Sequence, residues 1–199
     1  MKKITKIISK VILFITISII LILLGLYVWL NQRNVIDKET YNHLVEVIKT
    51  SEDLPDRFYE IYGQVTDFDK KSTTNKYLFN RLLNMRNYNT KNPCPCADVA
   101  YGFVYSSIDK WTVGFALDKD VSPKKCLDFY LSKFDFLYSA IGIQSASQFY
   151  YQKDLEQLTD TEMLELSVIT ISPSFYNNIR RPKNLEERVE KIKMNEKQK

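Results

Sequence analysis

The chain has little glycine and proline and a single histidine: 5 glycines, 6 prolines and His43 among 199 residues. So few helix-breaking residues favour a helical domain with few tight turns. The sequence has no glycine-rich phosphate-binding loop and no H-E-x-x-H motif, and nothing near His43 in the sequence marks it as a catalytic residue. With 45% apolar and 26% charged residues, the chain as a whole is not intrinsically disordered.

Acidic residues are absent from the first 30 positions, which contain four lysines. The whole chain carries 28 basic and 24 acidic residues, so these four lysines account for its formal charge of +4. Positions 31–199 are therefore neutral overall, and the sequence gives no support for a nucleic-acid partner.

Residues 11–30 form an uncharged apolar run. As a helix that rises about 1.5 Å per residue, this run would extend about 30 Å, the thickness of the hydrocarbon core of a bilayer. The lysines that precede it favour a cytoplasmic N-terminus. A cleaved signal peptide, the alternative, would have a shorter apolar region and an A-x-A-like site after it. We expect a basic cytoplasmic tail at 1–10, a transmembrane helix at 11–30 and one extracytoplasmic domain at 31–199.

Three cysteines leave three interpretations open. Outside the cytoplasmic membrane a disulfide is permitted, and Cys126 could pair with either Cys94 or Cys96. Unpaired thiols are the second interpretation. A zinc site is the weakest one, because the C-x-C spacing is not C-x-x-C and His43 is distant in the sequence.

Apolar periodicity and capping residues predict that helices dominate the domain. The segment 101–117 is apolar without a breaker and could be a buried helix or a strand. Five other helices are predicted. One spans 38–50 after the cap Asp37, one begins at Ser72-Thr73, and one begins at Ser122-Pro123. One follows the capping box Thr159-Asp160-Thr161-Glu162, and one runs from Asn184 to the C-terminus.

Residues 122–192 contain three sequence blocks that follow one another without a gap. They resemble the blocks of the peptidoglycan glycosyltransferases of glycosyltransferase family 51: S-K-x-x-I-L-E-x-Y-L-N, then G-I-x-x-A-A-x-x-Y-F-x-K, then P-s-x-Y-N-P. In the first block, Asp128 replaces Glu and Ser132 replaces Asn. The matching residues include Leu127, Tyr130, Leu131, Gly142, Ile143, Ala146, Tyr150, Lys153, Leu158, Thr159, Glu162, Pro173, Ser174, Tyr176, Asn177 and Arg188. The resemblance implies a mainly α, lysozyme-like transglycosylase-type domain on a single-pass anchor in a bacterial cytoplasmic (inner) membrane.

The N-terminal blocks of this family match less well. The family pattern E-D-x-x-F-x-x-H-x-G corresponds to Glu52–Gly63, with two inserted residues and Ile61 at the histidine position. The pattern G-x-S-T-I-T-Q-Q is reduced to Ser72-Thr73-Thr74-Asn75. The arginine, lysine and glutamate of R-K-x-x-E fall at Ser106, Ser107 and Lys110. The catalytic set implied by the resemblance is therefore incomplete.

Transglycosylation needs a base for the acceptor hydroxyl and positive charge for the departing lipid diphosphate. Without the resemblance, Glu52-Asp53 would be interpreted as a solvated turn. With it, Glu52 is the candidate catalytic base. The candidate substrate-binding residues are Asp53, Ser72, Thr73, Lys110 and Lys124, and Lys70 and Lys71 are further cations that could replace the lost basic pair.

Two functions follow from the resemblance. One is a divergent transglycosylase that elongates glycan from a lipid-linked disaccharide-peptide precursor. The other is a noncatalytic relative, a pseudoenzyme, that binds the glycan, the precursor or a cell-wall synthesis protein. No organic cofactor and no metal site are expected from the residues, although the family resemblance allows a divalent cation.

Overall fold

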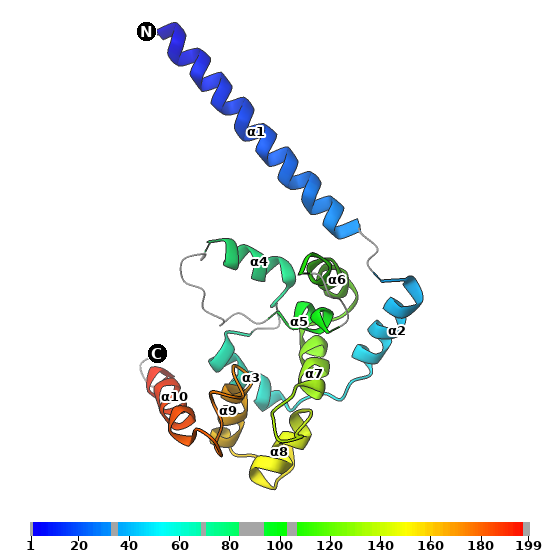
Figure 1. Cartoon of the computed structure of the whole chain (residues 1–199), viewed down its shortest axis with the longest axis vertical. Helices are drawn as coiled ribbons and strands as arrows, with labels where there is room; N and C mark the ends of the chain where they lie inside the picture. Colours follow the sequence, from blue (N-terminus) through cyan, green and yellow to red (C-terminus); the bar gives the residue numbers. More distant parts are fainter. Residues whose placement is uncertain (1, 33–35, 69–70, 84–93, 103–106, 197–199) are drawn as a thin grey trace.

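The structure, a computed structural model, describes residues 2–32, 36–68, 71–83, 94–102 and 107–196 (Figure 1). The mainly α fold that the sequence predicts is confirmed. The elements are α1 (Lys2–Gln32), α2 (Lys38–Lys49), α3 (Asp56–Thr66), α4 (Thr74–Leu83), α5 (Pro95–Tyr101), α6 (Ser107–Asp120), α7 (Pro123–Lys133), α8 (Ile143–Tyr151), the short 3-10 helix η1 (Leu155–Gln157), α9 (Asp160–Ile169) and α10 (Pro182–Glu196).

The first helix projects from the rest of the chain (Figure 1). Its apolar part, Ile7–Trp29, is long enough to cross a membrane, and its side chains are largely exposed. Near its C-terminal end, α1 packs against α6, where the rings of Tyr27 and Phe115 lie 6.0 Å apart. The division into tail, transmembrane helix and extracytoplasmic domain stays a prediction.

The helix starts that the sequence predicts are present. The Asp37 side chain accepts a hydrogen bond from the amide of Thr40 at 2.8 Å, and the Ser122 side chain accepts one from the amide of Lys125 at 3.2 Å. Thr159 and Glu162 form the expected capping box at the start of α9. For the ambiguous segment 101–117, the described residues from 107 onward are helical.

One helix start differs from the predictions, and the helices α3, α5 and α8 were not predicted. The last helix begins at Pro182, two residues before Asn184, because proline is well accommodated in the first turn of a helix. The sequence analysis did not predict α3 at all. This helix buries Phe58, Ile61, Tyr62 and Val65, whose spacing of three and four residues places them on one face.

The buried side chains form two apolar clusters, and α7 contributes to both. The first cluster joins α3, α7, α8, α9 and α10 and contains Leu127 and Leu131. The second joins α2, α5, α6 and α7 and contains Cys126 and Phe129. Because the residues of α7 point in different directions around its axis, one helix can supply both clusters. Helix α7 is therefore the central element of the domain.

The cysteine question is resolved in favour of one disulfide. Cys96 on α5 is bonded to Cys126 on α7, within the second apolar cluster. Cys94 is a buried free thiol, 3.4 Å from the hydroxyl oxygen of Thr74. Burial raises the pKa of the Cys94 thiol to about 11, so this cysteine is a poor nucleophile at neutral pH.

A tight connection of residues 134–142 joins α7 to α8. The amide of Gly142 donates to the carbonyl of Phe134 at 2.8 Å, which closes the connection. Gly142 has a φ of 84°, and a Cβ at this position would lie 2.6 Å from the carbonyl oxygen of Ser132. Three consecutive non-glycine residues, Leu137, Tyr138 and Ser139, also have positive φ values. The left-handed conformation costs such residues about 1 kcal/mol or more each.

We expect the Ser139→Gly variant to be more stable than the wild type. Ser139 is exposed, so glycine removes the left-handed strain without removing a buried contact, and the gain should be a few tenths to about 1 kcal/mol. Ser139→Val, which adds a β-branched side chain at the same φ, should lower stability. Urea unfolding curves of both variants test this prediction. Equal shifts of the two variants in the same direction would contradict it.

Candidate functional site

Glu52 lies at the mouth of a cavity of about 240 Å³. The cavity is bounded by the loop between α2 and α3 (residues 50–55, here the Glu52 loop), by α7 and by the first turn of α8. Its lining residues are Glu52, Leu54, Asp128, Ser132, Ile141, Gly142, Ile143, Gln144 and Ser145. Glu52, the candidate catalytic base, therefore lies in a concave site, and its catalytic role stays a prediction.

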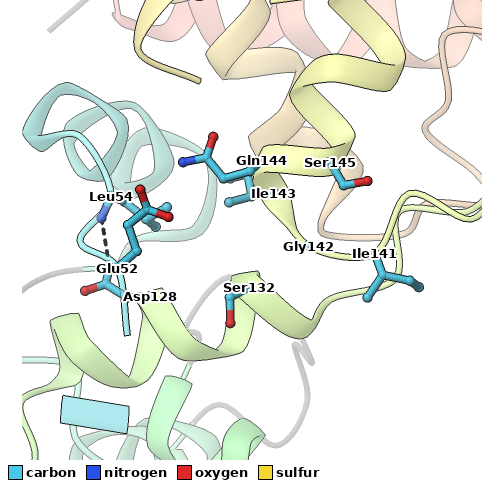
Figure 2. A pocket seen from close by; sticks show the side chains of 9 residues that line it. All are labelled: Glu52, Leu54, Asp128, Ser132, Ile141, Gly142, Ile143, Gln144 and Ser145. Carbon is cyan, nitrogen blue, oxygen red and sulfur yellow. Dashed lines mark hydrogen bonds between the residues drawn. The ribbon is translucent and has the colours of Figure 1, made fainter. Parts of the chain in front are cut away.

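The lining combines hydrogen-bonding groups with apolar walls. Figure 2 shows the side chains of Glu52 and Gln144 extending towards each other across the cavity. The other polar side chains come from α7 and from the start of α8, and Leu54, Ile141 and Ile143 are apolar. Carboxylate, amide and hydroxyl groups can together donate to and accept from a neutral polar ligand. The cavity therefore suits a ligand with several hydroxyl or amide groups.

Asp128 is the most deeply buried polar residue of this cavity, at 1% exposure. Its Oδ1 accepts hydrogen bonds from the Tyr59 hydroxyl and from the amide of Leu54, the latter at 3.4 Å. Burial raises the pKa of Asp128 to about 6, although the hydrogen bonds from Tyr59 and Leu54 and the charge of Lys125 act in the opposite direction. Asp128 is therefore a carboxyl group that changes its charge near neutral pH.

Two neighbouring lysines on α7 contact the region around Glu52. The Nζ of Lys125 donates to the carbonyl oxygen of Ser51 at 2.6 Å and lies 3.0 Å from an Asp53 carboxylate oxygen. The hydrogen bond and charge of Lys125 lower the pKa of Asp53. The predicted site residue Lys124 pairs with Asp56 at 3.3 Å and lies over the ring of Tyr59 at 4.4 Å. Both lysines are therefore already paired with carboxylates of the protein.

The other predicted site residues lie elsewhere. Ser72 is buried, and Thr73 precedes α4, which packs against α6. Lys110 on α6 lies 3.8 Å from an Asp98 carboxylate oxygen and over the rings of two aromatic residues, Tyr101 and Trp111. None of these three predicted residues is among those that line the Glu52 cavity. Lys71 is exposed, and Lys70 lies outside the described residues.

Two of the Lys110 partners, Asp98 and Tyr101, line a second, larger cavity of about 480 Å³. Its lining residues are Asp98, Val99, Tyr101, Gly102, Phe129, Tyr130, Lys133, Phe134 and Asp135. Helix α7 contributes Asp128 and Ser132 to the Glu52 cavity but Phe129, Tyr130 and Lys133 to this one, so the two cavities lie on different faces of α7. The structure therefore does not place Glu52 and Lys110 in one cavity.

Ile61, at the position where the family pattern has histidine, is buried at 6% exposure in the first apolar cluster. It contributes to the core of the domain and adds no polar group to the Glu52 cavity. Across the described part of the chain, no three histidine, cysteine or acidic side chains are grouped so that they could hold a metal ion.

Sequence reasoning missed Asp128, Ser132, Gln144 and Lys125 as site residues. Asp128 and Ser132 could have been found, because they are polar positions of the first block where this chain departs from the family pattern. Gln144 and Lys125 carry no comparable signal. Their roles depend on how α8 and the Glu52 loop pack against α7, which the spacing of residues does not show.

Parts of this chain are similar to a protein family and to known proteins. The family model described as Transglycosylase matches residues 104–196. Penicillin-binding protein 1F of Bacillus subtilis (strain 168) is 35% identical over 80 residues, which are 40% of this chain and 11% of that protein. Penicillin-binding protein 1A of Neisseria cinerea is 31% identical over 91 residues, which are 42% of this chain and 11% of that protein.

The match includes α7, α8, α9 and α10, the helices that contain the three blocks identified in the sequence. The alignments with the two penicillin-binding proteins span only about a ninth of the length of those proteins. Glu52 and its loop lie before the matched region, so the match does not bear on them. Residues 104–196 therefore match the transglycosylase family, glycosyltransferase family 51, and the comparisons support a transglycosylase domain in this part of the chain.

Proposed function

We propose that this domain binds a lipid-linked disaccharide-peptide precursor of peptidoglycan at the outer face of the cytoplasmic membrane and does not polymerise it. The match to the transglycosylase family supports the class of ligand. The apolar helix α1 supports a position beside the membrane, where a lipid-linked ligand would be located. In this proposal, the Glu52 cavity contacts a sugar of the precursor through its carboxylate, amide and hydroxyl groups.

The observation that carries the noncatalytic part is the separation of Glu52 from Lys110. Transfer of a sugar from a diphosphate requires a base at the acceptor hydroxyl and cations at the leaving group within one site. Glu52 lines one cavity, whereas Asp98, the ion-pair partner of Lys110, lines the other. Lys124 and Lys125, which contact the region around Glu52, are engaged by Asp56 and Asp53. The side chains described around Glu52 can thus bind a sugar but lack a free cation for the diphosphate.

A polymerising enzyme is the second candidate, and the position of Glu52 at a cavity favours it. The two candidates differ in one measurement. The full chain in lipid nanodiscs should bind the lipid-linked disaccharide precursor but form no glycan polymer from it. Polymer formation by the wild type, lost in Glu52→Gln, would establish the enzyme and overturn the noncatalytic proposal.

For binding, we expect Glu52→Gln to weaken precursor affinity about tenfold, the effect of losing one charge-assisted hydrogen bond. Glutamine has nearly the same shape as glutamate but offers no carboxylate to a sugar hydroxyl. Glu60→Gln, at an exposed position of α3 outside the cavity lining, is the matched control and should bind as the wild type does. If both variants bind equally well, the precursor does not use the Glu52 cavity.

A further inference from the structure

The Glu52 loop is attached to α7 on both sides of Glu52. Before it, the carbonyl of Ser51 accepts a hydrogen bond from Lys125 at 2.6 Å. After it, Asp53 pairs with Lys125 at 3.0 Å, and the amide of Leu54 donates to Asp128 at 3.4 Å. Among the described residues, no hydrogen bond or ion pair involves the Glu52 carboxylate. The neighbours of Glu52 are thus fixed, whereas its own side chain extends into the cavity (Figure 2).

The two residues of α7 that hold the loop act from one face of the helix. Lys125 and Asp128 are three positions apart, the spacing at which helical side chains are neighbours, and the Lys125 Nζ lies 4.0 Å from the Asp128 Oδ2. Tyr59 on α3 adds a third attachment, because its hydroxyl accepts a hydrogen bond from the amide of Leu54 at 3.1 Å and donates one to Asp128. The Asp128 side chain is buried, and the Lys125 side chain is partly exposed.

We propose that Lys125 and Asp128 are positioning residues: they fix the backbone of the Glu52 loop on α7 and point the Glu52 side chain into the cavity. The structural part of this inference stands on the contacts of the ligand-free chain. Its consequence for precursor affinity rests on the proposed function.

The charge of Asp128 reports the attachment of the loop. The groups that face Asp128 are Lys125 on the same helix, Glu52 and Asp53 on the loop, and Tyr59 on α3, whereas the residues of α8 that line the cavity are uncharged. Burial raises the pKa of Asp128 to about 6, and the hydrogen bonds from Tyr59 and Leu54 and the charge of Lys125 act in the opposite direction. The pKa of Asp128 should therefore change when one of these contacts is removed.

The first arm of the test needs no ligand. In NMR spectra of the full chain in lipid nanodiscs, the amide proton of Leu54 should shift with pH with a midpoint near 6, because it reports the charge of Asp128. Asp128→Asn should abolish this shift. Lys125→Ala should raise the midpoint, since it removes the cation that favours the ionised form. His43→Gln and Lys133→Ala are controls for loss of the single histidine of the chain and for loss of another lysine from α7, and neither should move the midpoint.

A Leu54 amide that does not respond to pH, or that responds equally in Asp128→Asn, would overturn the inference. If Asp128→Asn does not fold, Lys125→Ala and Tyr59→Phe decide instead. Both remove an interaction that lowers the pKa of Asp128, so both should raise the midpoint. An unchanged midpoint in these two variants would overturn the inference as well.

The second arm measures affinity for the lipid-linked disaccharide precursor. We expect Lys125→Ala to bind the precursor about tenfold more weakly than the wild type, the size of one lost charge-assisted hydrogen bond. Lys125→Arg should restore binding, which a general loss of stability would not produce. A titrating Leu54 amide with no precursor binding supports the positioning role and refutes the proposed function. Precursor binding that Lys125→Ala does not weaken, with a silent Leu54 amide, does the reverse.

Discussion

Replacing Leu127 or Leu131 with alanine is expected to lower the free energy of unfolding of the domain by about 2–5 kcal/mol. Both side chains have 0% exposure and belong to the first apolar cluster. Truncation removes buried methyl groups and leaves a cavity, because helix α7 is held in place from several sides and cannot move to fill it. Urea unfolding of the full chain in lipid nanodiscs, followed by tryptophan fluorescence, measures the loss.

Ile179→Ala is the matched control for this prediction. Ile179 is 58% exposed, so its truncation should change stability by no more than about 0.5 kcal/mol. A cost below about 1 kcal/mol at both leucines would contradict the buried position of this face of α7.

The second large effect is expected from removing the disulfide. The Cys96–Cys126 bond closes a loop with a sequence separation of 30 residues. In the chain-entropy description, a loop of this length makes the unfolded state less favourable by about 3–4 kcal/mol. The Cys96→Ala/Cys126→Ala double variant should therefore lose about that amount, measured by the same unfolding experiment.

Cys94→Ala distinguishes this disulfide from the alternative pairing. Cys94 is a free thiol, so the variant should keep the bond and stay sensitive to reductant. Peptide mapping without reduction should find Cys96 joined to Cys126 in both the wild type and Cys94→Ala. A Cys94–Cys126 peptide in the wild type would show that the other cysteine of the C-x-C segment is the partner.

Much of the fold could be predicted because its signals are local. Asp37, Ser122 and Thr159 each cap a helix with a side chain that bonds an amide three residues later, and this depends only on neighbouring residues. The three blocks after residue 122 are confirmed as parts of a transglycosylase domain. In contrast, α3 was missed, because its cap, Pro55, makes no side-chain hydrogen bond that a sequence pattern would show.

The candidate site was less predictable because it is assembled from distant segments. Glu52 could be chosen from the sequence, but its separation from Lys110 depends on which face of α7 each neighbour packs against. Asp128 illustrates the difficulty further. An aspartate in the middle of an amphipathic helix is expected to be solvated, and only the approach of Tyr59 and the Glu52 loop buries it. The roles of Ser72, Thr73, Lys110 and Lys124 in binding a substrate stay predictions.

The position of α7 in both apolar clusters has a consequence for folding cooperativity. Two clusters with separate helices could open independently, each with its own midpoint. Here Leu127 and Leu131 belong to one cluster and Cys126 and Phe129 to the other, so neither cluster can be taken apart while α7 keeps its place. The domain should therefore lose both clusters in a single transition, and the amide hydrogens of α7 should exchange with solvent only when the whole domain unfolds.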